Sequence, residues 1–403
     1  MLKRGCGTPH GVHDVLSAQC RMQRQIGEKL TKCYEKRGYT EVKTPLLEYY
    51  DLFLQGESVS DTASMYKLVD GGEVLVVRPD STAPIGRLVS SRLQNAPLPL
   101  RLYYHQDVFR VCGGHRGEHA QTTQCGVELI GVSGLRADTE IAETALRALA
   151  ETGLTEYKIE LGHAGIFRAL ASAIDFREGD GEKVRYLTEI KNYAAVNDVL
   201  KEYDEEYHDA CEALRRLPRI FGGGEIFAEA EAIIKTPAAA EALAYLKTVY
   251  EALCALGCGD RVMLDLALVN HMEYYTGIVL SGYAHGTGEP ILSGGRYDTL
   301  IANYGMDVAA TGFVVNVDAV AEALEKSGVD TEPKPAAELV HYEIECAAFA
   351  YAYAAEKRSA GYRVELSCAE SVEEALAVAA QKEIPTVVCF DATGIKRIDG
   401  RAE

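Results

Sequence analysis

The side chains that could do chemistry gather in short polar segments that interrupt apolar runs. They carry carboxylate, amide, hydroxyl and guanidinium groups, and they lie at residues 78–82, 109–110, 124–128 and 267–280. Because side chains alternate along a strand, Gln124, Gly126 and Glu128 would share one face, with the glycine leaving room between the amide and the carboxylate. A carboxylate inside a sheet face is costly unless it has a partner. The pattern therefore favours a small ligand that brings one cationic group and several hydrogen-bonding edges.

Two simpler interpretations of Glu128 stay open on spacing alone. The strand face could be solvated, or the carboxylate could pair internally with Arg110 or Arg78. The segment ALVNHMEYYTGIVL at 267–280 adds His271, an amide, a carboxylate and two tyrosines to an apolar run, without any Lys or Arg. His271 could close a pocket or face solvent, and the residues alone do not distinguish these roles.

The bulk composition is that of a globular chain with an acidic balance. With 403 residues, 47% apolar and 25% charged, the chain is long enough for two or three domains around a large core. A net charge of −19 argues against a nucleic-acid partner, which needs a dense array of Lys and Arg. The eleven cysteines are scattered, as suits a reducing cytosol, so we predict a cytoplasmic protein. The sequence shows no signal-peptide core and no run of about 18 apolar residues, so no membrane partner is expected.

Metal and nucleotide signatures are weak in this sequence. Cys254 and Cys258 are four residues apart but have no second pair of ligands nearby. His115 and His119 share that spacing, yet the glycines around them disfavour the helix that would place both on one face. No glycine-rich nucleotide-binding loop follows a strand. We therefore expect neither a metal nor a cofactor.

The first part of the chain, which must position the polar groups, is predicted to contain both helices and strands. Apolar residues at helical spacing predict helices at 17–37 and 81–94. Pro45 interrupts a strand and lacks a donor N–H, which predicts a sheet edge or an interface there. The sequence further predicts a hairpin around Asp70-Gly71-Gly72 and two longer strands at 100–111 and 122–132.

The rest of the chain adds a helical insertion, more strands and a terminal module. An Ala-, Leu- and Glu-rich helical block, interrupted by FGGGE, is expected at about 165–258. A charged, Pro-containing linker at 327–338 separates a core of residues 1–326 from a small α/β module at 339–403. The remaining predictions are a helix at 137–152, strands at 156–162, 261–269 and 276–283, a turn into a helix at 293–305, a strand and helix within 310–328, and a capping box at Ser371 and Glu374. This order predicts an α+β fold rather than a regular βαβ series.

Six segments in this order resemble the motifs of class II aminoacyl-tRNA synthetases, and most closely those of the histidyl enzymes. The resemblance covers roughly residues 5–325 and implies an antiparallel sheet flanked by helices. EVKTPLLE resembles the motif-1 strand, which implies a dimer with Pro45 at its interface. RPDST resembles the R-P-E-x-T loop, and VFR with TTQCGVELIG resembles motif 2. LVNHMEYYTG and SGGRYDTL resemble the two histidine-specific motifs, and TGFVVNVDAV resembles motif 3.

The departures from these motifs concern the cations of catalysis. The arginine that activates the carboxylate of histidine falls at Asn270, and the arginine that clamps ATP falls at Ala319. The motif-2 pattern R-x-E-R-P has become RVCGG at 110–114. Losing such preorganised charge costs about 3–4 kcal/mol of transition-state stabilisation per group. The resemblance therefore implies a pocket that holds histidine without activating it, and no catalytic residues.

That combination is similar to the regulatory subunits of ATP phosphoribosyltransferase, paralogues of the histidyl synthetases that act at the first step of histidine biosynthesis. GVHDVLSAQ, PLRLYYHQDVFR and GEPILSGGRYD carry this resemblance. It implies a hetero-oligomer with a short-form catalytic subunit, allosteric regulation by L-histidine, and no enzymatic activity of this chain alone. The terminal module has 7 Lys and Arg against 11 Asp and Glu, a net of −4 that is ill suited to tRNA. A divergent histidyl-tRNA synthetase, or a synthetase-like protein that binds another amino acid, stays open.

The resemblance also implies a role for each residue of a histidine pocket. Asp80, Thr82 and Gln124 would meet the α-ammonium, Glu128 and Tyr275 the imidazole nitrogens, Tyr274 and Tyr297 the ring faces, and Arg110 the carboxylate. Core packing of the tyrosines and a structural ion pair of Arg110 are the alternatives, and the pocket as a whole could be vestigial.

Overall fold

The chain folds into two compact units, residues 1–331 and 332–403. The structure is a computed structural model, and it describes residues 7–55, 62–113, 119–268, 275–329 and 334–400. Each unit has its own sheet and its own buried core.

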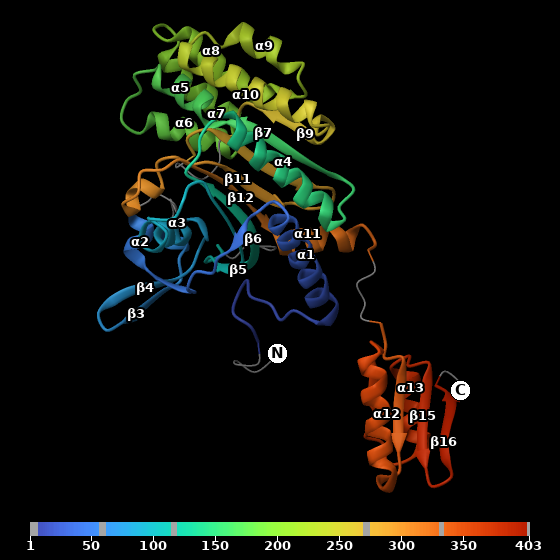
Figure 1. Cartoon of the computed structure of the whole chain (residues 1–403). Helices are drawn as coiled ribbons and strands as arrows, with labels where there is room; N and C mark the ends of the chain where they lie inside the picture. The colour runs from blue at the N-terminus through green and yellow to red at the C-terminus, as the bar shows by residue number, and fades with distance from the viewer. Residues whose placement is uncertain (1–6, 56–61, 114–118, 269–274, 330–333, 401–403) are drawn as a thin grey trace. The chain divides into compact units, whose positions relative to one another are not determined.

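The first unit is built on a long, mainly antiparallel sheet (Figure 1). Neighbouring strands run antiparallel except for β1 with β5 and β7 with β9. In spatial order the strands are β1 (Thr40–Glu41), β5 (Leu100–Phe109), β6 (Gln121–Ile130), β12 (Ala310–Asn316), β11 (Leu292–Arg296), β10 (Ile278–Ala284), β7 (Tyr157–His163), β9 (Val262–Asp265) and β8 (Phe221–Gly222). The predicted class of an α+β, class II synthetase-like sheet with flanking helices is confirmed.

Helices cover both faces of this sheet and thereby divide its core into two clusters. On one face, α1 (Ser17–Glu35), α4 (Leu135–Thr152) and α11 (Val317–Lys326) pack over the Val127 side of β6 (Figure 1). On the other face, α3 (Thr82–Arg92) packs beside Tyr104, Tyr275 and Tyr297. The helix predicted at 17–37 is confirmed, because Met22, Ile26 and Leu30 recur at helical spacing and are buried.

A smaller sheet of β2 (Leu47–Tyr49), β4 (Glu73–Val77) and β3 (Lys67–Asp70) precedes α3, with α2 (Tyr50–Leu54) beside it. The predicted hairpin is confirmed: Gly71 and Gly72 form its turn with φ of +58° and +94°, values that suit glycine. Pro45 lies between β1, an edge strand of the main sheet, and β2.

The helical insertion between β7 and β9 differs from its prediction at one point. Phe221 and Gly222, within the glycine-rich interruption, form the strand β8, which pairs with β9 and ends the main sheet. The glycines therefore bring the chain back to the sheet rather than only breaking a helix. The helices of this block are α5 (Ala164–Ser172), α6 (Asp180–Glu189), α7 (Tyr193–Leu200), α8 (His208–Arg216), α9 (Ile226–Ile233) and α10 (Pro237–Ala255).

The segment 293–305 was predicted as a turn into a helix, and this is confirmed only in its second half. Its first residues belong to β11, and a short 3₁₀ helix follows at Ile301–Tyr304. The reason is packing: a Cβ at Gly294 would lie 2.5 Å from the Gly312 carbonyl, so glycine lets β11 fit closely against β12.

The second unit is a sheet with one helix on each face. Its strands, in spatial order, are β14 (Val364–Leu366), β13 (Glu338–Tyr342), β15 (Thr386–Asp391) and β16 (Gly394–Asp399), with α12 (Ala347–Ser359) and α13 (Val372–Gln381) packed on the faces. The N–H of Glu374 donates to the Ser371 Oγ at 3.2 Å, which confirms the predicted cap of α13. The antiparallel strand β16 was not predicted. Among the described helices of both units, none combines the length and apolar character that a membrane crossing requires.

Candidate functional site

Glu128 is the centre of a buried polar cluster on the α3 side of the main sheet. It is only 2% exposed, so the solvated strand face considered above is excluded. The Thr82 hydroxyl donates to its Oε1 at 3.2 Å, and the Tyr297 hydroxyl donates to its Oε2. Burial raises the pKa of the Glu128 carboxyl to about 8, although these two hydrogen bonds lower it.

The backbone leaves room for this carboxylate because glycine stands opposite it. Gly312 on β12 is the direct partner of Glu128 on β6, and a Cβ there would collide with the Glu128 carboxylate. A larger residue at Gly312 is therefore incompatible with the observed position of Glu128.

Asp80 is a second buried carboxylate in the same cluster. It is 4% exposed, and its Oδ1 accepts from the Ala83 N–H at 3.1 Å at the start of α3. Its Oδ2 is buried with no hydrogen-bond partner within the described residues. Burial raises the pKa of Asp80, and the charge of Asp80 in turn raises that of Glu128. An unpartnered buried oxygen of this kind is a place where a ligand donor would be favourable.

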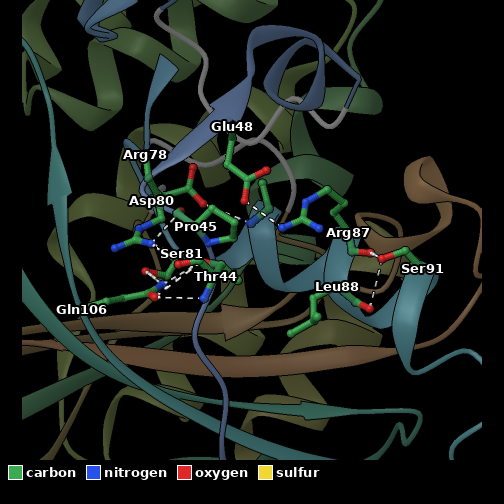
Figure 2. A network of polar contacts seen from close by, with 11 residues as sticks. Thr44, Pro45, Glu48, Arg78, Asp80, Ser81, Arg87, Leu88, Ser91 and Gln106 are labelled. Atoms are coloured by element: carbon green, nitrogen blue, oxygen red, sulfur yellow. Dashed lines mark hydrogen bonds and ion pairs between the residues drawn. The ribbon is translucent and has the colours of Figure 1, made fainter. Parts of the chain in front are cut away.

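The loop that carries Asp80 is fixed by Arg78 (Figure 2). The Arg78 guanidinium donates to the carbonyl oxygens of Thr44 at 2.9 Å, of Pro45 at 2.8 Å and of Asp107 at 2.6 Å. Arg78 therefore holds backbone rather than Glu128. No ion pair to an arginine is present for Glu128 in the described part of the chain, so the second simple interpretation is wrong as well.

Tyrosines fill the space around the two carboxylates. A Cβ at Gly126 would lie 2.5 Å from the Tyr104 hydroxyl, so Tyr104 occupies the room that we expected a ligand to take beside this glycine. Tyr275 is 5% exposed, and Gly295 makes space for it, since a Cβ there would lie 2.8 Å from its ring. No pattern in the sequence indicated this role of Tyr104 beyond its place in an alternating strand.

A cavity of about 230 Å³ opens beside the cluster, over the ends of β5 and β6. Arg110, Gln124 and Asn316 are among its lining residues. The Arg110 side chain is exposed, and its Nε donates to the Pro79 carbonyl at 2.9 Å. The Gln124 side-chain oxygen accepts from Ser81 at 3.3 Å, next to Asp80. Gln124 thus links the cavity to the carboxylate cluster.

The structure therefore brings together most of the residues expected in the pocket. Asp80, Thr82, Glu128 and Tyr297 are joined by hydrogen bonds or charge, while Arg110 and Gln124 line the adjoining cavity. Tyr297 donates to Glu128 instead of only lining a ring face, which the sequence did not indicate. Tyr274, Asn270, His271 and His115 lie outside the described residues.

Two further positions bear on the chemistry of the site. Ala319 lies in the first turn of α11, where its N–H donates to the Asn316 Oδ1 at 3.1 Å, and its methyl side chain offers no charge for a phosphate. Cys254 is exposed and Cys258 is buried. Across the described residues, no three His, Cys, Asp or Glu side chains are arranged to hold a metal ion.

Comparison with known proteins gives one consistent relationship. The family model described as histidyl-tRNA synthetase matches residues 11–320. The chain is 37% identical to an ATP phosphoribosyltransferase regulatory subunit of Clostridium kluyveri, over 93% of this chain and 97% of that protein. It is 32% identical to the protein of the same name from Bacillus cereus, over 96% of this chain and 92% of that one.

Solved structures agree with these sequence relationships. A crystal structure described as an ATP phosphoribosyltransferase regulatory subunit/histidyl-tRNA synthetase from Bacillus halodurans superposes with a TM-score of 0.84 at 32% identity, covering 95% of this chain and 98% of that one. A histidyl-tRNA synthetase from Nostoc superposes with a TM-score of 0.78 at 20% identity, over 98% and 97%, which supports the fold alone.

Proposed function

This chain belongs to the histidyl-tRNA synthetase family and, within it, to the regulatory subunits of ATP phosphoribosyltransferase, and from that membership we propose how it works. It forms a hetero-oligomer with a short-form catalytic subunit, which it activates and makes sensitive to L-histidine. It performs no amino-acid activation itself. The supporting observation is a buried carboxylate cluster, Asp80 and Glu128, without an ion-paired arginine in the described residues and with Ala319 in place of a cation.

In this proposal, L-histidine is held by the cluster and the adjoining cavity. Its α-ammonium is placed at the unpartnered Oδ2 of Asp80, with Thr82 and Gln124 nearby. Its imidazole lies between Glu128 and the tyrosines, and Arg110 at the cavity wall takes the carboxylate. Tyr274 belongs to the same proposed pocket.

Feedback follows from differential affinity for two arrangements of the complex. Histidine shifts the activity only as far as it binds the inhibited arrangement more tightly than the active one, typically about 5- to 150-fold. The subunit supplies the histidine site, and the catalytic subunit supplies the phosphoribosyl transfer.

We further propose that the chain self-associates as a dimer through the segment around Pro45. Leu46, Leu47 and Tyr49 are 48%, 45% and 61% exposed, and the hairpin of β3 and β4 adds more exposed apolar side chains. Exposed apolar residues gathered on one small sheet are typical of an interaction surface.

Reconstitution tests the central proposal. Phosphoribosyl transfer is measured with the catalytic subunit alone, with this chain alone and with both, across a range of L-histidine concentrations. We expect activity only in the mixture and inhibition by histidine. Activation without inhibition would agree with a role as regulatory subunit but would contradict the proposal that histidine is its effector.

Two assays separate the alternative functions. ATP–pyrophosphate exchange in the presence of histidine would identify a divergent synthetase, and we expect none. A thermal-shift screen across the amino acids would reveal a different ligand, whereas we expect the largest rise in melting temperature with L-histidine.

A further inference from the structure

The helical insertion is connected to the backbone that carries the pocket tyrosines. The Arg168 Nη2, on α5, donates to the carbonyl oxygen of Tyr275 at 2.5 Å. The N–H of Ala164, at the start of the same helix, donates to the carbonyl oxygen of Gly277 at 2.9 Å. These two bonds lie on either side of Thr276 and fix the point from which the Tyr275 side chain projects.

A second connection runs from α10 through a buried ion pair. The Tyr245 hydroxyl donates to the Asp138 Oδ2 at 2.5 Å, and the Arg296 Nε donates to the Asp138 Oδ1 at 2.9 Å. Asp138 is fully buried and Arg296 is 5% exposed. Burial lowers the pKa of Arg296, but the hydrogen bonds and charges of Asp138 and Asp298 together outweigh it and raise that pKa. Tyr245 thus fixes the carboxylate of Asp138. Asp138 in turn holds Arg296, the residue that precedes Tyr297.

The two connections meet where residues 275–277 lie against residues 296–298. The N–H of Thr276 donates to the Arg296 carbonyl at 2.7 Å, and the N–H of Asp298 donates to the Thr276 Oγ1 at 3.0 Å. The Arg296 Nη1 also donates to the Asp298 Oδ1 at 2.7 Å. Residues 275–277 and 296–298 are therefore joined by hydrogen bonds, and they carry both pocket tyrosines. The helices α5 and α10 of the insertion both hold this pair of segments, α5 directly and α10 through Asp138.

We propose that Arg168 and Tyr245 are positioning residues through which the helical insertion sets the pocket tyrosines. Binding of an amino acid in the pocket and packing of the insertion on the sheet then stabilise each other, because both require the same arrangement of Tyr275 and Tyr297. This inference rests on the proposed histidine pocket and assigns to the insertion a share in its affinity.

The matched pair Tyr245→Phe and Tyr250→Phe tests the α10 connection. Both tyrosines lie on α10, but the Tyr250 hydroxyl accepts from the Gly224 N–H at 3.1 Å and has no part in the Asp138 network. We expect Tyr245→Phe to raise the Kd of L-histidine about fivefold or more and Tyr250→Phe to leave it within about twofold, measured by calorimetry on the full chain.

A second pair, Arg168→Gln and Arg216→Gln, tests the α5 connection. Arg216 is at the end of α8 and pairs with Glu229 at 2.7 Å on the surface of the same insertion. We expect weaker histidine binding only for Arg168→Gln. Hydrogen exchange should show that histidine protects residues 164–172 in the unmodified chain and protects them less in both pocket-linked variants.

The outcomes separate this inference from the proposed function. A Tyr245→Phe variant with a lower melting temperature but an unchanged Kd and unchanged histidine-induced protection would show a purely structural role and overturn the inference alone. If the unmodified chain binds no histidine, both the pocket and the inference are rejected.

Discussion

The Tyr297 hydroxyl donates a hydrogen bond to Glu128, although the two residues are 169 positions apart in the sequence. The bond joins the residue that follows β11 to a residue near the end of β6, across the intervening strand β12. The bond lowers the pKa of this carboxyl group, but burial raises it more, to about 8, so that Glu128 is mainly protonated at neutral pH in the unliganded chain. Loss or gain of a proton at Glu128 is therefore the chemical event on which several expectations depend.

Replacing Glu128 by Gln should weaken histidine binding by about 10- to 100-fold, because a hydrogen bond to a charged group contributes about 1.5–3 kcal/mol. Calorimetry of the full chain checks this. Glu231→Gln, at an exposed surface position on α9, serves as control. If the unmodified chain and Glu128→Gln bind L-histidine with equal affinity, Glu128 does not contact the ligand.

The stability of the unliganded chain should fall as pH rises towards 8. The pKa of Glu128 lies at about 8 when folded, above the ordinary value of 4.5, so the folded state holds a proton that the unfolded state has released. This contribution is complete below pH 4.5 and is lost as pH rises through 8. Urea denaturation between pH 5.5 and 8.5 should show a smaller pH dependence for Glu128→Gln than for the unmodified chain.

Histidine binding at pH 7 should release protons. A cationic ammonium or imidazole beside Asp80 and Glu128 favours their ionised forms, whereas burial alone raises both pKa values. Calorimetric titrations in two buffers with different ionisation enthalpies measure the number of protons. Identical enthalpies in both buffers would contradict the placement of a cation at these carboxylates.

Gly312→Ala should destabilise the first unit by about 1–3 kcal/mol and impair the pocket, since the added methyl group collides with the Glu128 carboxylate. Chemical denaturation gives the free energy of unfolding. Gly288→Ala is a suitable control, because a Cβ at that exposed glycine meets nothing within 4 Å. Similar stability of the two variants would mean that β12 can move away from Glu128 without loss.

Placing a charge in the exposed apolar sheet should dissociate the proposed dimer. Val69 in β3 is 79% exposed, and Val69→Glu would bury a carboxylate at the interface if that surface pairs. Sedimentation velocity measures the change. Ile395→Glu, at a 59% exposed apolar residue of β16 in the second unit, should leave the mass unchanged.

Much of the fold was predictable because local patterns determine it. The alternation in β6 correctly placed Gln124 and Glu128 on one face, and helical spacing located α1. Two-residue strands such as β8 were not predictable, because their pairing depends on the edge that β9 offers and not on their own sequence.

The motifs predicted members of the candidate site but not the contacts among them. The motifs gathered Asp80, Glu128 and Tyr297, yet neither periodicity nor resemblance indicated that Tyr297 would donate to Glu128. Tyr104 was missed for a related reason. Its hydroxyl reaches the space beside Gly126 on the neighbouring strand, and such a cross-strand approach has no signal within one segment.

Arg78 lies two residues before Asp80 and binds the carbonyl oxygens of Thr44 and Pro45. A displacement of the Thr44–Pro45 segment must therefore carry Arg78 with it or break those bonds. If a second copy of the chain binds at this edge, as proposed, such a displacement would also move the loop that carries Asp80. Amino-acid binding in one copy would then change the affinity of the other, and the response to rising amino-acid concentration would be steeper.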